Sequence, residues 1–312
     1  MDLAEGSTLT LKGTGNVTVN NLKGSLVAYV SNTERLTGTL TVNLANATGN
    51  AIAITTGTNT TTLNSSAAGD TITVNATAMD DGKVLTIDGS GGYTITGLAA
   101  DLTSTVNGGA IDITTVNVVN QTIALGAGTN GTRTVNATAM ADGGLLTLTG
   151  SGAVTVTSTD ADINAEAYAG AITATVTNTA AATFQTGTAA AALTANGSAA
   201  LTIDADAAAG NAGTLTINGA ATGAIAVTGA ENTVTLANTF TGTGAFSVTT
   251  ADASITVALG TSNTPASRTV NATAAADGKT ITLTGDQAVT VTSNDADINA
   301  EAYAGAITAT VT

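Results

Sequence analysis

The fold is decided by a stretch of sequence that the chain carries twice. Residues 134–177 read TVNATAMADGGLLTLTGSGAVTVTSTDADINAEAYAGAITATVT, and residues 269–312 read TVNATAAADGKTITLTGDQAVTVTSNDADINAEAYAGAITATVT. The two copies agree at 37 of 44 positions at an offset of 135, and a weaker copy begins at Thr73. Because such similar repeats indicate duplication of a structural unit, we expect residues 1–312 to form one continuous β-repeat region.

Short segments of alternating apolar and polar residues follow one another along the whole chain. In AVTVTS, for example, Val154 and Val156 fall on one face of an extended strand and Thr155 falls on the other. Glycine and asparagine separate the segments, as turns require. The best helix candidates, residues 161–171 and 188–195, lack a full set of caps. The pattern therefore predicts an all-β protein.

The small number of aromatic residues distinguishes between all-β architectures. The chain has three Phe, four Tyr and no Trp, whereas sandwich cores usually depend on large aromatic side chains. A solenoid instead fills a narrow core with aliphatic residues and gains burial by stacking its coils. One coil of two strands, roughly 18–20 residues, cannot offset its own ordering cost. We therefore predict a parallel β-solenoid (β-helix), with a tandem β-sandwich array as the alternative.

Composition also limits the possible partners and chemistry. The formal charge is −15, from 22 acidic and seven basic residues, so we expect no nucleic-acid partner, because phosphate binding needs clustered Lys and Arg. The chain has no His and no Cys, which removes the usual general bases and thiol nucleophiles, and we expect no enzyme activity. It also lacks a run of 18 apolar residues, so we expect no helix that spans a membrane.

The strongest candidate for a ligand site is an acidic segment that occurs in both copies. Its candidate metal ligands are Asp160, Asp162, Asn164 and Glu166, and in the second copy Asp295, Asp297, Asn299 and Glu301. Oxygens at alternate positions lie on one side of an extended segment, and Ca²⁺ prefers six to eight oxygen ligands. An EF-hand is excluded, because Ala165 and Ala300 stand where that loop needs glycine. Two interpretations stay open: a Ca²⁺ site at a solenoid edge, or a solvated polar turn.

Thr-X-Thr triplets such as Thr155–Thr157 and Thr282–Thr284 recur in the predicted strands. Threonine is a favourable exposed strand residue, and similar triplets form the flat hydroxyl arrays of ice-binding solenoids. Such arrays need a fixed coil length, and the unequal spacing of the triplets in this chain argues against that function.

The second copy stops at Thr312, whereas the first continues into NTAAATFQTG. A solenoid end without a cap exposes unpaired backbone groups and invites another chain. We therefore expect either a fragment of a longer protein or a subunit that stacks on copies of itself, end to end or laterally. The first residues, MDLAEGSTLTLKG, lack the basic and apolar regions of a signal peptide.

The segments TVNATA, GSGAVTVTS and DADINAEAYAGAIT, with the bias towards Thr, Ala, Gly and Asn, resemble bacterial cell-surface β-strand repeat proteins. The composition and the short repeated segments are similar to those of RTX-type surface-layer proteins and large repetitive adhesins, although the glycine-rich calcium nonapeptide is absent. The resemblance implies an extracellular structural role at a bacterial surface, often dependent on calcium.

Two classes of function follow as expectations. A structural protein would assemble into a surface layer, filament or fibre. An adhesin stalk or binding module would stay monomeric and bind a cell-surface glycan, another surface or ice.

Overall fold

The computed structural model describes residues 6–46, 49, 51–128, 131–206, 213–261, 265 and 267–312. The chain divides into two compact units, residues 1–141 with 146–155 and residues 142–145 with 156–312. The described residues contain strands and turns but no helix, so no helix among them could cross a membrane. The predicted all-β class is confirmed, and the helix candidates form strands and turns instead.

The strands of the first unit are β1 (Thr8–Thr10), β2 (Val17–Leu22), β3 (Ser25–Val27), β4 (Tyr29–Ser31), β5 (Glu34–Arg35), β6 (Leu40–Leu44), β7 (Ala51–Thr55), β8 (Thr61–Ser65), β9 (Thr71–Asn75), β10 (Val84–Gly89), β11 (Gly92–Leu98), β12 (Asp101–Ser104), β13 (Ile111–Thr115), β14 (Asn120–Ala124) and β15 (Arg133–Ala137). The boundaries between the units fall in β16 (Leu145–Thr149) and β17 (Val154–Ser158).

The strands of the second unit are β18 (Asp162–Asn164), β19 (Ile172–Val176), β20 (Ala182–Gln185), β21 (Ala191–Ala195), β22 (Leu201–Asp204), β23 (Leu215–Gly219), β24 (Ile225–Ala230), β25 (Val234–Leu236), β26 (Phe246–Thr250), β27 (Ile255–Ala258), β28 (Arg268–Ala272), β29 (Thr280–Thr284), β30 (Val289–Ser293), β31 (Asp297–Asn299) and β32 (Ile307–Val311).

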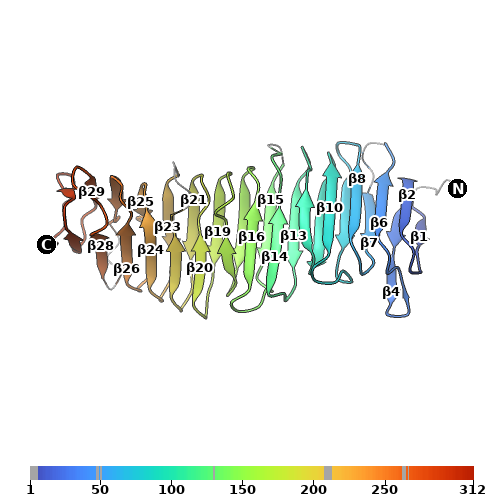
Figure 1. Cartoon of the computed structure of the whole chain (residues 1–312), viewed down its shortest axis with the longest axis horizontal. Helices are drawn as coiled ribbons and strands as arrows, with labels where there is room; N and C mark the ends of the chain where they lie inside the picture. The colour runs from blue at the N-terminus through green and yellow to red at the C-terminus, as the bar shows by residue number, and fades with distance from the viewer. Residues whose placement is uncertain are drawn as a thin grey trace. The chain divides into compact units, whose positions relative to one another are not determined.

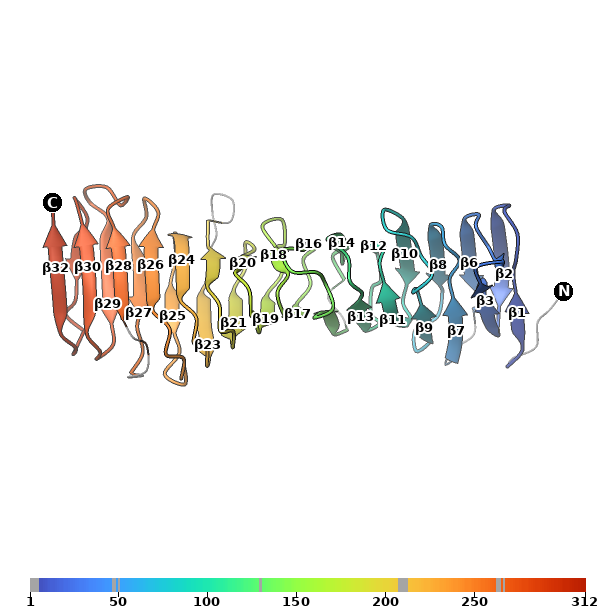
Figure 2. The ribbon, with the colours of Figure 1, turned by 90° about the horizontal axis from the view of Figure 1, so that it is seen from below.

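Each unit is a parallel β-solenoid in which successive strands alternate between two sheets. In the first unit the sheet orders are β1-β3-β7-β9-β11-β13-β15 and β2-β6-β8-β10-β12-β14. In the second unit they are β19-β21-β23-β25-β27-β29-β31 and β18-β20-β22-β24-β26-β28-β30-β32. Figures 1 and 2 show these strands following one another in rows within each unit. The predicted solenoid of two strands per coil is confirmed, and the tandem β-sandwich alternative is wrong.

The core is built from aliphatic side chains that stack in register from coil to coil. In one sheet of the first unit the stack consists of Leu26, Ile54, Val74, Ile95, Ile113 and Val135. All six are buried, because alternation turns every second residue of a strand towards the interior. Val154 and Val156 are buried and Thr155 is exposed, as the alternation predicts.

The coil lengths cover a wider range than the predicted 18–20 residues. Val84 pairs with Asp101, 17 residues later, whereas Thr256 pairs with Thr282, 26 residues later. The strands keep their register because the turns between them absorb the difference.

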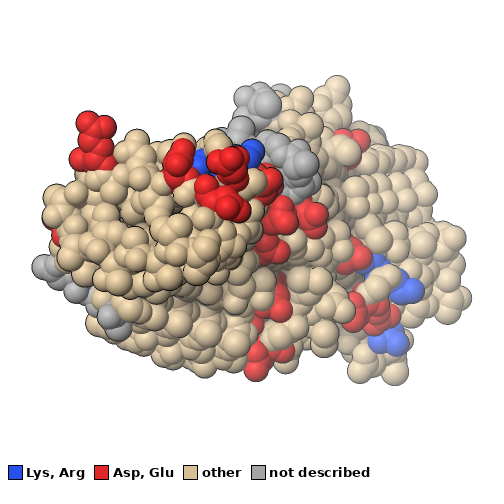
Figure 3. All heavy atoms as spheres, turned by 60° about the vertical axis from the view of Figure 1, so that its left-hand side comes forward, with Lys and Arg blue, Asp and Glu red and all other residues tan. Residues whose placement is uncertain are grey.

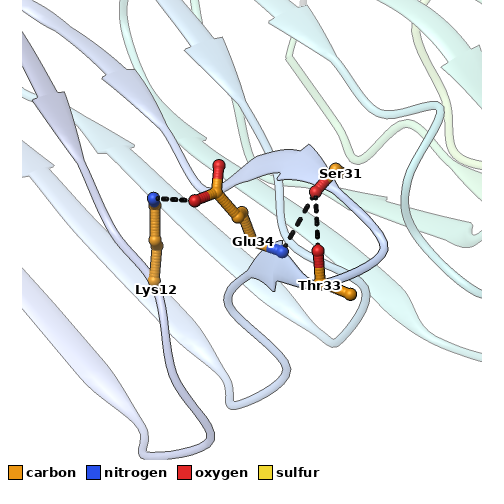
Figure 4. Close-up of polar contacts among 4 residues, drawn as sticks. All are labelled: Lys12, Ser31, Thr33 and Glu34. Carbon is orange, nitrogen blue, oxygen red and sulfur yellow. Dashed lines mark hydrogen bonds and ion pairs between the residues drawn. The ribbon is translucent and has the colours of Figure 1, made fainter.

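One antiparallel hairpin, formed by β4 and β5, departs from the solenoid and projects from its ribbon (Figure 1). Lys12 Nζ lies 2.8 Å from Glu34 Oε1, and the Ser31 hydroxyl accepts the Glu34 N–H at 3.2 Å (Figure 4). Both partners of the ion pair are about half exposed, so it contributes little to stability. The Ser31 bond closes the hairpin, and the ion pair joins it to the segment after β1.

The second halves of the two copies show one sequence in two environments. Ile172 and Val176 in β19 are 2% and 1% exposed, because β21 covers them. Their counterparts Ile307 and Val311 in β32 are 38% and 69% exposed, because among the described residues β32 pairs on one edge only, with β30. The covering coil therefore completes the burial of the coil before it.

We predict that Ile172→Ala destabilises the chain by about 2–5 kcal/mol, the usual loss for a buried aliphatic side chain. Ile307→Ala, in the same sequence context, should cost less than half as much. Denaturant unfolding followed by circular dichroism measures both changes. Equal losses would contradict the assignment of burial to the covering coil.

Candidate functional site

The repeated sequence TVNATA builds the end of a strand and the turn that follows it. Asn75, Asn136 and Asn271 each accept, through the side-chain oxygen, the N–H and the hydroxyl of the threonine two residues later, at 2.7–3.2 Å. A glycine with positive φ ends each turn, at Gly82, Gly143 and Gly278, where L side chains are strained. The three copies therefore repeat one turn, and these asparagine side chains hold it in place.

The acidic segment of the first copy lies on β18 and its flanking turns. Asp162 and Asn164 point outward on either side of the buried Ile163, as the alternate spacing predicts. Asp160 precedes the strand, and Glu166 follows it. The Asn164 side-chain oxygen accepts the Glu166 N–H at 3.0 Å and closes the turn after the strand.

The carboxylates of the first copy accept hydrogen bonds from the next coil. Asp160 Oδ1 accepts the N–H groups of Thr179 and Ala180 at 2.6 and 2.9 Å. Asp162 Oδ1 accepts the Thr183 N–H at 2.6 Å. Charge-assisted hydrogen bonds of this kind favour the ionised carboxylate. The segment therefore fastens one coil to the next, a role that the sequence alone did not reveal.

The pKa of Asp160 lies below its ordinary value. The main cause is the hydrogen bond from the Ala180 N–H, with further lowering by the N–H and hydroxyl of Thr179 and an opposing contribution from partial desolvation. Because ionisation is coupled to these bonds, the bonds also depend on pH.

The second copy of the segment is exposed. The Asp297 N–H donates to the Lys279 carbonyl at 2.8 Å, but the carboxylates of Asp295 and Asp297 accept no hydrogen bond from the described residues. Asn299 accepts the Glu301 N–H at 3.1 Å, as Asn164 accepts that of Glu166 in the first copy. Asp297 and Asn299 lie on β31, in the sheet that also contains β19, whereas Asp162 and Asn164 lie on β18, in the sheet of β32. The two copies are therefore half a coil out of phase, and one sequence serves both sheets of the second unit.

The two copies of the acidic segment differ in how many carboxylate oxygens are free to bind Ca²⁺. Within the part of the chain that the structure describes, no three His, Cys, Asp or Glu side chains are grouped to hold a metal ion. In the first copy Oδ1 of Asp160 and Oδ1 of Asp162 accept N–H groups, so a cation would share these carboxylates with the next coil, and Ca²⁺ binding stays a prediction there. Asp295, Asp297, Asn299 and Glu301 keep their oxygens exposed, and Ca²⁺ binding stays a prediction for that copy.

Two arginines at equivalent repeat positions are buried, which the sequence analysis missed. Arg133 is 3% exposed, and its guanidinium lies where side chains at Gly128 or Gly152 would stand. Arg268 is also buried and borders a groove of about 330 Å³ with Gln287, Thr290 and Thr308. Burial lowers the pKa of Arg268, while nearby Tyr303 and Asp286 oppose the shift. The period of two is the sequence signal that could have found Arg133, which lies two residues before the buried Val135 on β15.

We predict that Asp160→Ala lowers the free energy of unfolding by about 1 kcal/mol at pH 7, as loss of a capping carboxylate does. The folded state lowers the pKa of Asp160, so its contribution is complete above the ordinary aspartate pKa of about 3.9 and is lost as the pH falls further. Asp160→Asn should therefore flatten the stability profile below about pH 5. Asp295→Ala is the matched control, and an equal loss there would contradict the role of the next coil.

Comparison of the chain with protein-family models, with curated proteins and with solved structures found no match.

Proposed function

We propose that the chain is an extracellular structural protein of a bacterial surface whose molecules assemble end to end through the edges of their coils. The carrying observation is that each coil is completed by its neighbours, as the burial of Ile172 and Val176 beneath β21 shows. In the described residues β31 pairs only with β29, and β32 pairs only with β30. Within the described residues, each of these two strands therefore has one edge without a paired strand.

The first described coil presents the opposite edge in the same way. Among the described residues β1 pairs only with β3, and β2 pairs only with β6. An unpaired edge strand is a template for another strand, and strand addition supplies main-chain hydrogen bonds. The exposed Ile307 and Val311 would gain the burial that β21 gives to Ile172 and Val176. Backbone pairing and apolar burial thus favour the same association.

The surface supports an extracellular structural role more than a catalytic one. On the face drawn in Figure 3, acidic side chains outnumber basic ones, and most of the surface is uncharged. Thr residues recur on the outer faces, where they alternate with buried aliphatic residues and are favourable in exposed strands. Together with the resemblance to surface-layer proteins and adhesins, this favours a layer, filament or fibre at the cell surface, and we propose no enzyme activity.

We expect purified chain to form filaments or sheets in negative-stain electron microscopy, with and without calcium as separate arms. Val311→Lys places a charge on the apolar side of the free edge and should prevent assembly. Thr310→Lys, its neighbour on the outward face, is the control and should leave assembly intact. A chain that stays monomeric at every calcium concentration would contradict the proposal.

A second candidate function, binding to ice or to an ordered glycan, gains support from the register of the second unit. Outward side chains of β26, β28, β30 and β32 form two rows, Ser247, Thr269, Thr290 and Thr308 in one and Thr249, Asn271, Thr292 and Thr310 in the other. Rows on neighbouring strands repeat every ~4.8 Å, and alternate residues along a strand every ~6.7 Å. The unequal coil lengths do not disturb these rows, so the objection from spacing is removed.

For this second function we predict that the chain inhibits ice recrystallisation and that Thr290→Tyr abolishes the effect by disrupting the hydroxyl rows. Thr222→Tyr, at an exposed turn, is the control and should have no effect. Absence of inhibition by the unmodified chain would remove ice as the ligand.

A further inference from the structure

The repeated turn TVNATA carries a sequence motif that the proposed assembly does not use. Each copy contains Asn-Ala-Thr, with the asparagine at Asn75, Asn136 and Asn271, and Asn-X-Ser/Thr is the triplet at which sugars are attached through asparagine. The chain holds ten such triplets, and in a chain so rich in Thr and Asn many arise by chance. The geometry of the side chains distinguishes the three copies in TVNATA from the others.

A tight turn places the asparagine and the threonine of each copy together at the surface. In the first copy the Met79 N–H donates to the Ala76 carbonyl at 3.0 Å, and the corresponding bonds in the other two copies measure 3.1 and 3.2 Å. The residue that closes each turn is buried, whereas the asparagine and the threonine are exposed; the closing residues are Met79, Met140 and Ala275. The buried residue anchors the turn and leaves the polar pair in solvent.

Two hydrogen bonds fix the asparagine amide in one orientation. The side-chain oxygen of Asn136 accepts the Thr138 N–H at 3.1 Å and the Thr138 hydroxyl at 2.8 Å. Asn75 and Asn271 accept the same pair of bonds from their own threonines. Because the oxygen is held by two donors, the amide nitrogen Nδ2 points away from them. In the described chain no group accepts a hydrogen bond from Nδ2 of these three residues.

Two other triplets have their amide nitrogen engaged. Asn59 Nδ2 donates to the Thr37 carbonyl at 3.1 Å, and Asn64 Nδ2 donates to the Asn43 side-chain oxygen at 2.6 Å. Both asparagines are half-buried. A sugar could be attached to either nitrogen only after that hydrogen bond to the preceding coil had opened.

The remaining triplets lack the bonds between asparagine and its own hydroxyl residue. The oxygens of Asn16 and Asn196 accept N–H groups from the next coil, and Asn120 makes no bond to its threonine in the described chain. The triplets at Asn46 and Asn130 include residues outside the described part of the chain. Of the triplets that the structure describes in full, only those in TVNATA combine an exposed, unengaged nitrogen with a threonine held beside it.

The structure assigns Asn75, Asn136 and Asn271 as acceptor sites for N-linked sugars. The reaction joins Nδ2 to the anomeric carbon of a sugar, while the bond from that carbon to a diphosphate oxygen breaks. The diphosphate leaves with the bonding electrons, and the amide gives one proton to a base on the transferase. The donor is therefore a glycosyl diphosphate, and the transferase is a separate protein that approaches Nδ2 from solvent.

The three sites lie on outward faces of the strands. Asn75 on β9 and Asn136 on β15 belong to one sheet of the first unit, and Asn271 lies on β28 in the second unit. A bulky sugar on an outward face leaves the backbone ladder between coils intact, so the inference does not depend on the assembly proposed above. On Asn271 the sugar would stand in the outward row that contains Thr249 and Thr292, and the modified chain would not present that row to ice.

Incubation of the folded chain with a transferase specific for Asn-X-Ser/Thr and a nucleoside diphosphate hexose tests the assignment. Peptide mapping by mass spectrometry locates each added hexose. We expect Asn75, Asn136 and Asn271 to be modified at least about tenfold faster than Asn59 and Asn64, whose nitrogens must first leave a hydrogen bond. In peptides prepared by digestion before the incubation, this difference should disappear.

Two variants at one site test the role of the threonine. Thr138→Val removes the hydroxyl and should abolish modification of Asn136, whereas Thr138→Ser keeps a hydroxyl and should retain it. Asn75 and Asn271 in the same molecules are internal controls for folding and for transferase activity.

Three outcomes would overturn the assignment. One is an equal rate at all five asparagines of the folded chain. Another is modification of the three sites in the digested peptides but not in the folded chain, which would mean that the turn blocks the transferase. The third is failure in both preparations while a control acceptor peptide is modified. None of these outcomes bears on end-to-end assembly, which electron microscopy of the unmodified chain tests separately.

Discussion

The parallel backbone ladder between coils is the interaction on which the rest of this structure depends. Each strand satisfies its N–H and C=O groups with the strands of the coils before and after it, and an isolated coil has nowhere else to place them. The same neighbours bury its inward side chains, as Ile172 beneath β21 shows. Stability is therefore shared between neighbours and not contained within a coil. A chain rich in Thr, Ala, Val and Gly, with only seven aromatic residues, can therefore fold because neighbouring coils bury one another's side chains.

The ladder constrains the strands and leaves the turns free. Coils that differ by nine residues in length, 17 against 26, still pair in register. The acidic segments of the two near-identical copies lie in different sheets, half a coil out of phase. This is possible because strands of both sheets require the same alternation of inward and outward residues. The duplicated unit is thus a strand with its turn, and the solenoid accepts it on either sheet.

Local patterns predicted the parts of this structure that depend on local chemistry. The period of two in AVTVTS correctly identified Val154 and Val156 as core residues, and the low aromatic content correctly favoured a solenoid over a sandwich. Coil length and phase escaped prediction, because they depend on which strands pair across turns of unequal length. The buried Arg133 escaped for a related reason, since its space comes from Gly128 on another strand connection and from Gly152.

The acidic segment shows where sequence pattern reaches its limit. Alternate spacing correctly put Asp162 and Asn164 on one outward face, and oxygens on one face suggested a cation. The groups that these oxygens meet are N–H donors about one coil later in the chain, on Thr179, Ala180 and Thr183. Backbone N–H groups carry no signature in a sequence, so only the folded chain reveals them as the partners of the carboxylates.

Directionality gives this acidic segment a consequence beyond one coil. Side-chain acceptors on an earlier coil and backbone donors on a later one make the two edges of a solenoid chemically different, although both are edges of parallel sheets. These hydrogen bonds therefore add a side-chain contribution, with one fixed direction along the chain, to the backbone ladder that joins the same coils.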